Sequence, residues 1–191
     1  MEATVFLAQK PLRASYRATP GQAMVTDHAR TGNQQLTDPF RTSVQPMDGC
    51  GIVVPIGTHA ALGGPHDSPT PGDMLCAALA ACQDSAFRMV ANLLGIEITR
   101  LEVRVTASAD VRGAMAMDPG VPVGFQVMSC EVDYSVSDGT PAAMRAKLEV
   151  AAQRCCVVQQ TLKTPPEVRT VFSPTVITAI RPGASPAIAP R

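Results

Sequence analysis

The strongest pattern along the chain is a helical repeat of apolar residues near its middle. Six apolar side chains recur there at the three- and four-residue spacing of one helix face: Leu75, Leu79, Cys82, Ala86, Val90 and Leu93. Thr70 is a favourable N-cap, Pro71 suits the first turn, and Gly95 follows the last apolar position. Asp73 stands in the first turn, where its charge suits the helix dipole. We predict a helix over 71–94.

Two segments after this helix alternate apolar and polar residues as half-buried strands do. The alternation is clean over 101–107, and it runs again over 121–136 with a change of parity near Val127 and Met128. A change of parity inside one strand predicts a β-bulge. The connection 110–120 is rich in turn-forming residues.

A second helix is predicted after Thr140 and Pro141, which repeat the start signal of the first. Its apolar residues form one stripe: Met144, Leu148, Ala151 and Cys155.

The remaining segments read as short strands and turns. The β-prone runs of the N-terminal part are 5–8, 22–26, 42–45 and 51–56. Residues 167–172 and 175–180 are expected to be closing strands. Because a strand pair stands between two helices, we predict antiparallel pairing and an α+β fold. We expect one domain over 1–180 with a strand-rich arm over 1–50, and a disordered tail over 181–191, which alternates Pro, Gly, Ala and Ser.

The composition narrows the class of protein. The 191 residues carry 16 Lys+Arg and 16 Asp+Glu, a net charge of zero, which argues against a nucleic-acid binder and a polybasic membrane-surface protein. Hydrophobic residues make up 46% of the chain and Trp is absent, so Ala, Val, Leu and Met must fill the core. The sequence has no glycine-rich phosphate loop after a strand, and nucleotide binding therefore has no support.

The location of the protein follows from its N-terminus and its apolar runs. Glu2 stands where a signal peptide needs basic residues. The longest other apolar run, Met74–Cys82, is about half of the roughly 20 residues that a membrane span needs. We expect a cytoplasmic protein that makes no membrane contact.

Six cysteines are the candidate chemical groups: Cys50, Cys76, Cys82, Cys130, Cys155 and Cys156. No CxxC is present and the three histidines lack zinc-ligand spacing, so we expect neither a metal nor another cofactor. Cys82 lies in the apolar stripe of the first helix, and Cys156 lies close to Arg154, either late in the second helix or at the start of a new turn. Either one is a packing residue or a reactive thiol. We expect Cys130 to be a packing residue of the core. Cys76 and Cys82 are expected to point to different faces of the helix, and Cys50 is expected to lie in a turn.

Five segments together resemble the OsmC/Ohr family. They are THAALGG (58–64), GDMLCAALAAC (72–82), DVRG (110–113), PVGF (122–125) and CVVQQTL (156–162). Each motif alone is weak, whereas the ordered set over about 50–172 is fairly specific.

The resemblance implies an OsmC-like fold in which antiparallel sheets of two chains wrap around central helices, in an intertwined homodimer. Well-studied members are thiol peroxidases that reduce organic hydroperoxides and are recycled by an external dithiol. By motif position Cys82 matches the attacking cysteine, which becomes a sulfenic acid. Cys156 matches the resolving cysteine that closes the disulfide, and Cys155, placed on the buried stripe, is the alternative resolving residue.

The sequence departs from the peroxidase pattern at one supporting position. Those relatives carry a Pro-Glu pair before the attacking cysteine, and its glutamate holds an arginine over the thiolate. Here the pair is Pro71-Gly72, with Asp73 displaced by one, and the arginine is either Arg30 or Arg41. His59 matches a histidine of one branch of the family and is either a site residue or a turn residue.

Three functions are therefore considered. The first is a thiol-dependent peroxidase for organic hydroperoxides using Cys82 and Cys156. The second, motivated by the missing glutamate, is an OsmC-like protein that lacks peroxidase activity and binds a small apolar or thiol ligand. In the third, all six cysteines are packing residues.

Overall fold

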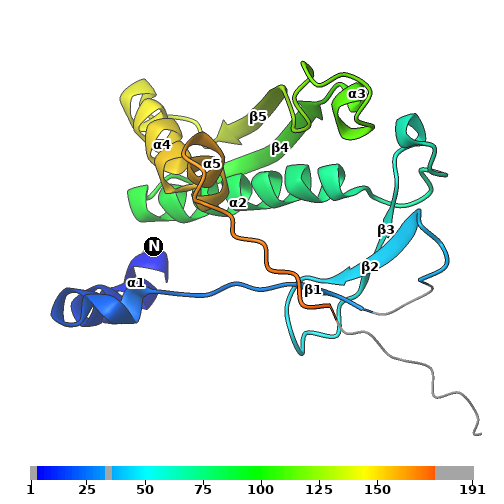
Figure 1. The fold of residues 1–191 in the computed structure, drawn as a ribbon. Helices are drawn as coiled ribbons and strands as arrows, with labels where there is room; N and C mark the ends of the chain where they lie inside the picture. The colour runs from blue at the N-terminus through cyan, green and yellow to red at the C-terminus, as the bar shows by residue number, and fades with distance from the viewer. Residues whose placement is uncertain (1–3, 33–35, 175–191) are drawn as a thin grey trace, which may run out of the picture.

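The computed structural model describes residues 4–32 and 36–174, and its centre is the long helix α2, Pro71–Leu94 (Figure 1). The bounds predicted from the apolar repeat are confirmed. Thr70 and Asp73 form a capping box, since each accepts a hydrogen bond from the backbone N–H of the other. Gly95 ends the helix at φ 67°, a left-handed conformation that favours glycine.

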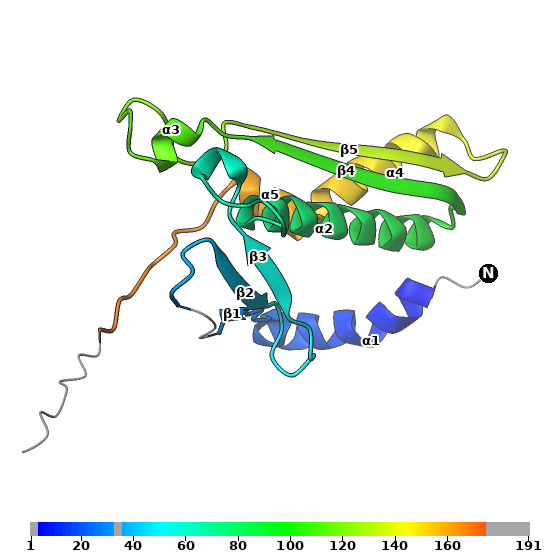
Figure 2. The same ribbon diagram turned by 90° about the vertical axis from the view of Figure 1, so that its right-hand side faces the viewer.

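Strands β4, Ile98–Ser108, and β5, Val127–Val136, form an antiparallel ribbon that covers one side of α2 (Figure 2). Every second residue of β5 faces inward, so Cys130, Val132 and Tyr134 are half-buried. The ribbon was predicted, but its bulge was not placed correctly. The irregularity in register lies between Ile98 and Arg100.

The change of parity in the sequence marks the start of β5 instead of a bulge. Residues 121–126 form no strand and follow the short helix α3, Val111–Ala114, which lies in the connection expected to be rich in turns. The apolar residues before Val127 therefore belong to a loop with its own packing.

Helices α4, Ala142–Cys155, and α5, Val157–Lys163, pack against α2. The main core lies between α2 and α4, and its buried members are Phe87, Val90, Ala91, Ile96, Leu148 and Ala152. The predicted cap of α4 is wrong by one residue, because Pro141 occupies the N-cap position. The hydroxyl of Thr140 instead donates to the carbonyl of Ser137 at 2.8 Å.

The N-terminal part begins with a helix where a strand was expected. Helix α1 covers Thr4–Ala18 and is followed by the 3₁₀ turn η1, Pro20–Ala23, so the predicted strands over 5–8 and 22–26 are wrong. A run of four apolar residues fits a strand and one helical turn equally well. Contact with α2 selects the helix, since the backbone N–H of Val5 donates to Asn92 Oδ1 at 2.9 Å.

Three short strands form a second, antiparallel sheet in the order β1-β2-β3. Their bounds are Arg30–Thr31, Arg41–Gln45 and Val54–Gly57. The predicted strand over 42–45 is confirmed, and the one over 51–56 begins later than expected. The 3₁₀ turn η2, Ala60–Leu62, leads on toward α2.

The segment after α5 has no regular structure up to residue 174, and the predicted strand over 167–172 is wrong. Val168, Val171 and Phe172 are largely exposed, so no neighbouring strand selects an extended pairing there. The predicted strand over 175–180 and the tail over 181–191 lie outside the described residues.

Helix α2 is also long and apolar enough, by length and composition, to cross a membrane. Its apolar content has a second explanation in this fold. The helix is the shared packing surface of β4, α4 and α5.

Candidate functional site

Cys82 lies in the middle of α2, on the face that meets the ribbon and α5. Leu79 and Ala86, one helical turn away on either side, are buried with it, and Cys82 itself is half-buried. The helical repeat of the sequence therefore placed this thiol on the correct face. Its position leaves the residue half-buried within an apolar wall.

Cys156 lies in the break between α4 and α5, where its backbone is extended at φ −75° and ψ 101°. This break turns the side chain of Cys156 inward, and the residue is 0% exposed. Cys155, the last residue of α4, is exposed. The expectation that Cys155 lies on the buried stripe is therefore wrong, since the helix stops before the repeat can continue.

The two motif cysteines meet in the core. Cys82 packs against the cluster of Leu79, Ala86 and Cys156. The backbone N–H of Val158, in the first turn of α5, is 3.5 Å from Cys82 Sγ and donates to it. A backbone donor is a suitable partner for a sulfur that carries negative charge. The arrangement brings a half-buried cysteine against a wholly buried one.

Burial raises the pKa of Cys156 to about 11, and the neighbouring Cys82 and Cys130 sulfurs add to the rise. The backbone N–H of Gln159 near the sulfur offsets part of it. At neutral pH Cys156 is therefore a protonated thiol. Such a group reacts slowly by itself and is suited to a step in which its partner sulfur has already been activated.

Cys130 is a third thiol of this centre, and the sequence analysis assigned it to packing alone. It packs against the same cluster from β5 and is half-buried. Burial raises its pKa. The signal that could have found it is its inward parity in β5, which points at the face of α2 that carries Cys82.

The two candidate arginines belong to the N-terminal sheet. Arg30 pairs with Asp48, and Arg41 pairs with Asp38 and Asp67. Within the described residues neither guanidinium forms an ion pair or hydrogen bond with a cysteine of the centre. The structure therefore does not bring the expected arginine to Cys82 within one chain.

His59 and Asp73 have local structural roles. His59 is the N-cap of η2, with Nδ1 accepting from the backbone N–H of Ala61 at 3.0 Å, and its ring lies 4.2 Å from that of His66. The carboxylate of Asp73 accepts hydrogen bonds from the backbone N–H and the hydroxyl of Thr70, and these two donors lower the pKa of Asp73. Neither residue touches the thiol centre through a described contact.

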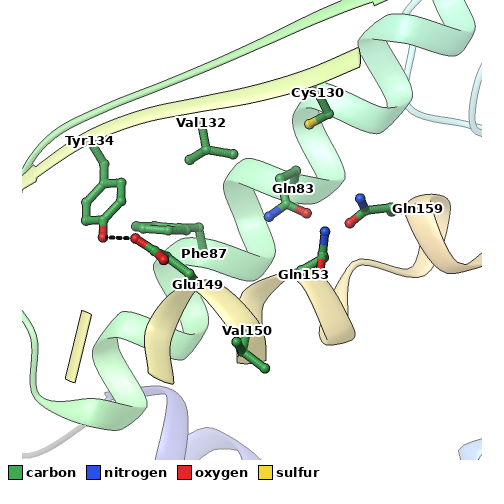
Figure 3. Close-up of a pocket in the computed structure, with 9 residues that line it drawn as sticks. All are labelled: Gln83, Phe87, Cys130, Val132, Tyr134, Glu149, Val150, Gln153 and Gln159. Atoms are coloured by element: carbon green, nitrogen blue, oxygen red, sulfur yellow. Dashed lines mark hydrogen bonds between the residues drawn. The ribbon is translucent and has the colours of Figure 1, made fainter. Parts of the chain in front are cut away.

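Three cavities surround this part of the fold. A cavity of about 390 Å³ between β5, α2 and α4 is lined by Gln83, Tyr134 and Cys130, among others (Figure 3). A second of about 540 Å³ has Cys130 and Phe125 in its wall. A third of about 590 Å³, between η2, α2 and α3, has His59, Gly72 and Phe125 in its wall and is mostly apolar.

No group of three His, Cys, Asp or Glu side chains is arranged as metal ligands within residues 4–32 and 36–174.

Comparison with known proteins identifies the family. The model of the family described as OsmC-like protein matches residues 64–171, which is more than half of the chain. No curated protein matches the sequence. An OsmC-like protein from Mycoplasma pneumoniae has a similar structure, with 13% identity and a TM-score of 0.58 over 74% of this chain and 89% of that chain.

Two further similar structures are of organic hydroperoxide resistance proteins. One, from Elizabethkingia anophelis, is 18% identical with a TM-score of 0.55 over 75% of this chain and 92% of that chain. The other, from Legionella pneumophila, is 20% identical with a TM-score of 0.54 over 74% of this chain and 92% of that chain. At such identities the likeness shows the α+β fold alone. Because the family model matches most of the region that carries the thiol centre, the chain belongs to the family of OsmC-like proteins.

Proposed function

We propose that this protein is a thiol peroxidase that reduces organic hydroperoxides through Cys82 and Cys156. The observation that carries the proposal is the packing of the half-buried Cys82 against the wholly buried Cys156 at the start of α5. Two of the similar structures are of proteins described as organic hydroperoxide resistance proteins, which supports the same chemistry.

The reaction begins with the Cys82 thiolate. Its sulfur attacks one peroxide oxygen, an S–O bond forms, the O–O bond breaks, and the alkoxide leaves as an alcohol after taking a proton. Cys82 is then a sulfenic acid. The sulfur of Cys156 displaces hydroxide from it, water forms, and a Cys82–Cys156 disulfide results. An external dithiol returns two electrons and restores both thiols.

The apolar surroundings of Cys82 favour an organic substrate. Leu79, Val105 and Met128 line the cluster around the thiol. An alkyl group entering there loses its contact with water, which is favourable by about 25 cal/mol per Å² of apolar area buried. Hydrogen peroxide has no such group and gains nothing from the wall.

We also propose that the working form is a homodimer. Helix α1 has no buried residue, and its apolar side chains Phe6, Leu7 and Leu12 are each about half exposed. Val25 and Ile52, in the loops around the N-terminal sheet, are more exposed still. Exposed apolar area of this extent is typical of a surface that a partner covers. Analytical ultracentrifugation should give twice the mass of the chain, and a monomer at micromolar concentration would contradict the proposal.

The peroxidase proposal is tested with cumene hydroperoxide and dithiothreitol. We expect Cys82→Ser to abolish peroxide consumption. Without dithiothreitol, Cys156→Ser should reduce about two equivalents and then stop, because the first oxidises Cys82 to sulfenic acid and the second to sulfinic acid, which the mass spectrum detects. Cys155→Ser, which changes an exposed neighbouring thiol, is the matched control and should keep the wild-type rate. Unchanged activity in Cys82→Ser would exclude the proposal.

A second candidate function is ligand binding without peroxide chemistry. It is favoured by the mostly apolar cavity of about 590 Å³ beside Gly72, and by the fact that no arginine within residues 4–32 and 36–174 forms a hydrogen bond with Cys82. A small apolar or thiol ligand would occupy that cavity. This function predicts that the wild type consumes no hydroperoxide and that Cys82→Ser leaves the affinity for the ligand unchanged.

A further inference from the structure

The third thiol of the centre, Cys130, differs from the other two in what it faces. It lines the cavity of about 390 Å³ on one side and the cavity of about 540 Å³ on the other. Cys82 and Cys156 are absent from the walls of both. A small molecule in either cavity is therefore next to Cys130 and not next to Cys82 or Cys156.

Cys130 also lies close to the buried sulfur. It packs against the cluster that contains Cys156, and its charge would raise the pKa of Cys156. Cys156 is 0% exposed, so no external thiol reaches its sulfur in this conformation. Cys130 therefore packs against Cys156 and also lines both cavities.

The cavity of about 390 Å³ is suited to a small, polar, hydrated ligand. Gln83 is 5% exposed and its Oε1 has no hydrogen-bond partner, and Gln159 Oε1 is unpartnered in the same way. Figure 3 shows these two amides directed toward that of Gln153, with the Cys130 sulfur above Gln83. Buried carbonyl oxygens without partners are paired in practice by water or by a ligand that donates.

We propose that Cys130 is an exchange thiol, which takes over the disulfide from Cys82 and presents it to the external reductant in these cavities. The proposal rests on the peroxidase function. In the first step the Cys130 thiolate attacks Cys156 Sγ, the Cys82–Cys156 bond breaks, and a Cys130–Cys156 bond forms. The electron pair leaves on Cys82 Sγ, so the oxidation state of the protein is unchanged.

In the second step an external dithiol supplies the electrons. One of its thiolates attacks Cys130 Sγ, and Cys156 leaves and takes a proton. The second thiol of the reductant then attacks the mixed disulfide and releases Cys130. The dithiol ends as a disulfide, and all three cysteines are thiols again.

The route is tested by trapping the mixed disulfide on the full-length protein. The Cys82–Cys156 disulfide is formed with one equivalent of cumene hydroperoxide, treated briefly with the monothiol 2-mercaptoethanol, quenched in acid and mapped by mass spectrometry. We expect the adduct on Cys130. An adduct on Cys82 or Cys156 would overturn the proposal. If peroxide forms no disulfide, the peroxidase function fails, and diamide then forms the same disulfide so that the exchange is still tested.

A pair of variants gives a kinetic test. Cys130→Ser should form the Cys82–Cys156 disulfide in the first turnover at the wild-type rate, while steady-state turnover with dithiothreitol falls at least about tenfold. Cys76→Ser changes another half-buried thiol, on α2, and is the matched control with unchanged turnover. Wild-type turnover in Cys130→Ser would also overturn the proposal. Circular dichroism checks that both variants are folded.

Discussion

The ring of Phe125 occupies the space that a side chain at residue 72 would need. A Cβ added to Gly72 would lie 2.8 Å from Cζ of Phe125, closer than two carbon atoms approach without moving. Peroxidase relatives are expected to carry their glutamate at this position. Gly72 leaves room for the ring, and Phe125 forms part of the wall of two cavities.

We expect Gly72→Glu to be accommodated poorly. Phe125 is 39% exposed, so its ring can swing away, and the cost is the loss of its packing, about 1–2 kcal/mol in the free energy of unfolding. The same replacement in a Phe125→Ala background should cost less than half as much. Urea denaturation of the two single variants and the double variant measures this coupling. Gly124→Ala, where no atom lies within 4 Å of the added Cβ, is the control.

The formation of the disulfide should depend steeply on pH. The pKa of Cys156 is raised to about 11, so its thiolate fraction increases about tenfold for each unit between pH 7 and pH 9. We expect the decay of the Cys82 sulfenic acid to accelerate in the same proportion. Stopped-flow mixing with one equivalent of hydroperoxide, followed by dimedone trapping, measures that decay. A rate that is flat over this range would show that Cys156 does not attack as the thiolate.

Much of the centre of the fold follows from local patterns. The repeat of α2 and the alternation of β4 are determined by burial on one face, and the sequence displays that burial directly. The same repeat placed Cys82 correctly. Antiparallel pairing was predicted because the two strands follow one another between two helices, and the structure confirms it although helix α3 and a loop separate them.

The remaining features depend on contacts that are distant in the sequence. Helix α1 is selected by its contact with Asn92. The inward turn of Cys156 depends on a break between two helices that the apolar repeat over 142–155 does not predict. Cys130 and Phe125 gain their importance from cavities formed by several elements. Single-residue patterns do not report such cavities, and these residues were assigned to packing or to a strand.

Two threonines with the same sequence context should differ in their contribution to stability. Thr70 caps α2 through the N–H of Asp73, whereas the hydroxyl of Thr140 donates to a turn carbonyl and caps nothing. We expect Thr70→Ala to lower the free energy of unfolding by about 1–2 kcal/mol and Thr140→Ala by about 0.5 kcal/mol. Urea denaturation at pH 7 measures both, and equal costs would contradict the structural difference.

The cost of Thr70→Ala should also shrink in acid. The pKa of Asp73 is lowered first by the backbone N–H of Thr70 and then by its hydroxyl. A carboxyl whose folded pKa lies below its unfolded value stabilises the fold above the unfolded pKa, and this contribution disappears as the pH falls through the folded pKa. The part due to the hydroxyl is missing in Thr70→Ala. We therefore expect the variant and the wild type to converge as the pH is lowered from 5 toward 2.

The junction of α2 and α4 should be the most sensitive point of the fold to truncation. Leu148 is 0% exposed and packs in the cluster of Phe87, Val90 and Ala152, so Leu148→Ala leaves a cavity and should cost about 3–4 kcal/mol in the free energy of unfolding. Val150, two residues along α4, is 70% exposed, and Val150→Ala is the matched control with a change within about 0.5 kcal/mol. Because α4 carries the break that turns Cys156 inward, Leu148→Ala should also slow formation of the Cys82–Cys156 disulfide at temperatures where the variant is still folded. Denaturation and disulfide mapping of the same samples separate the two effects: a large loss of stability with an unchanged rate of disulfide formation would show that α4 does not position Cys156.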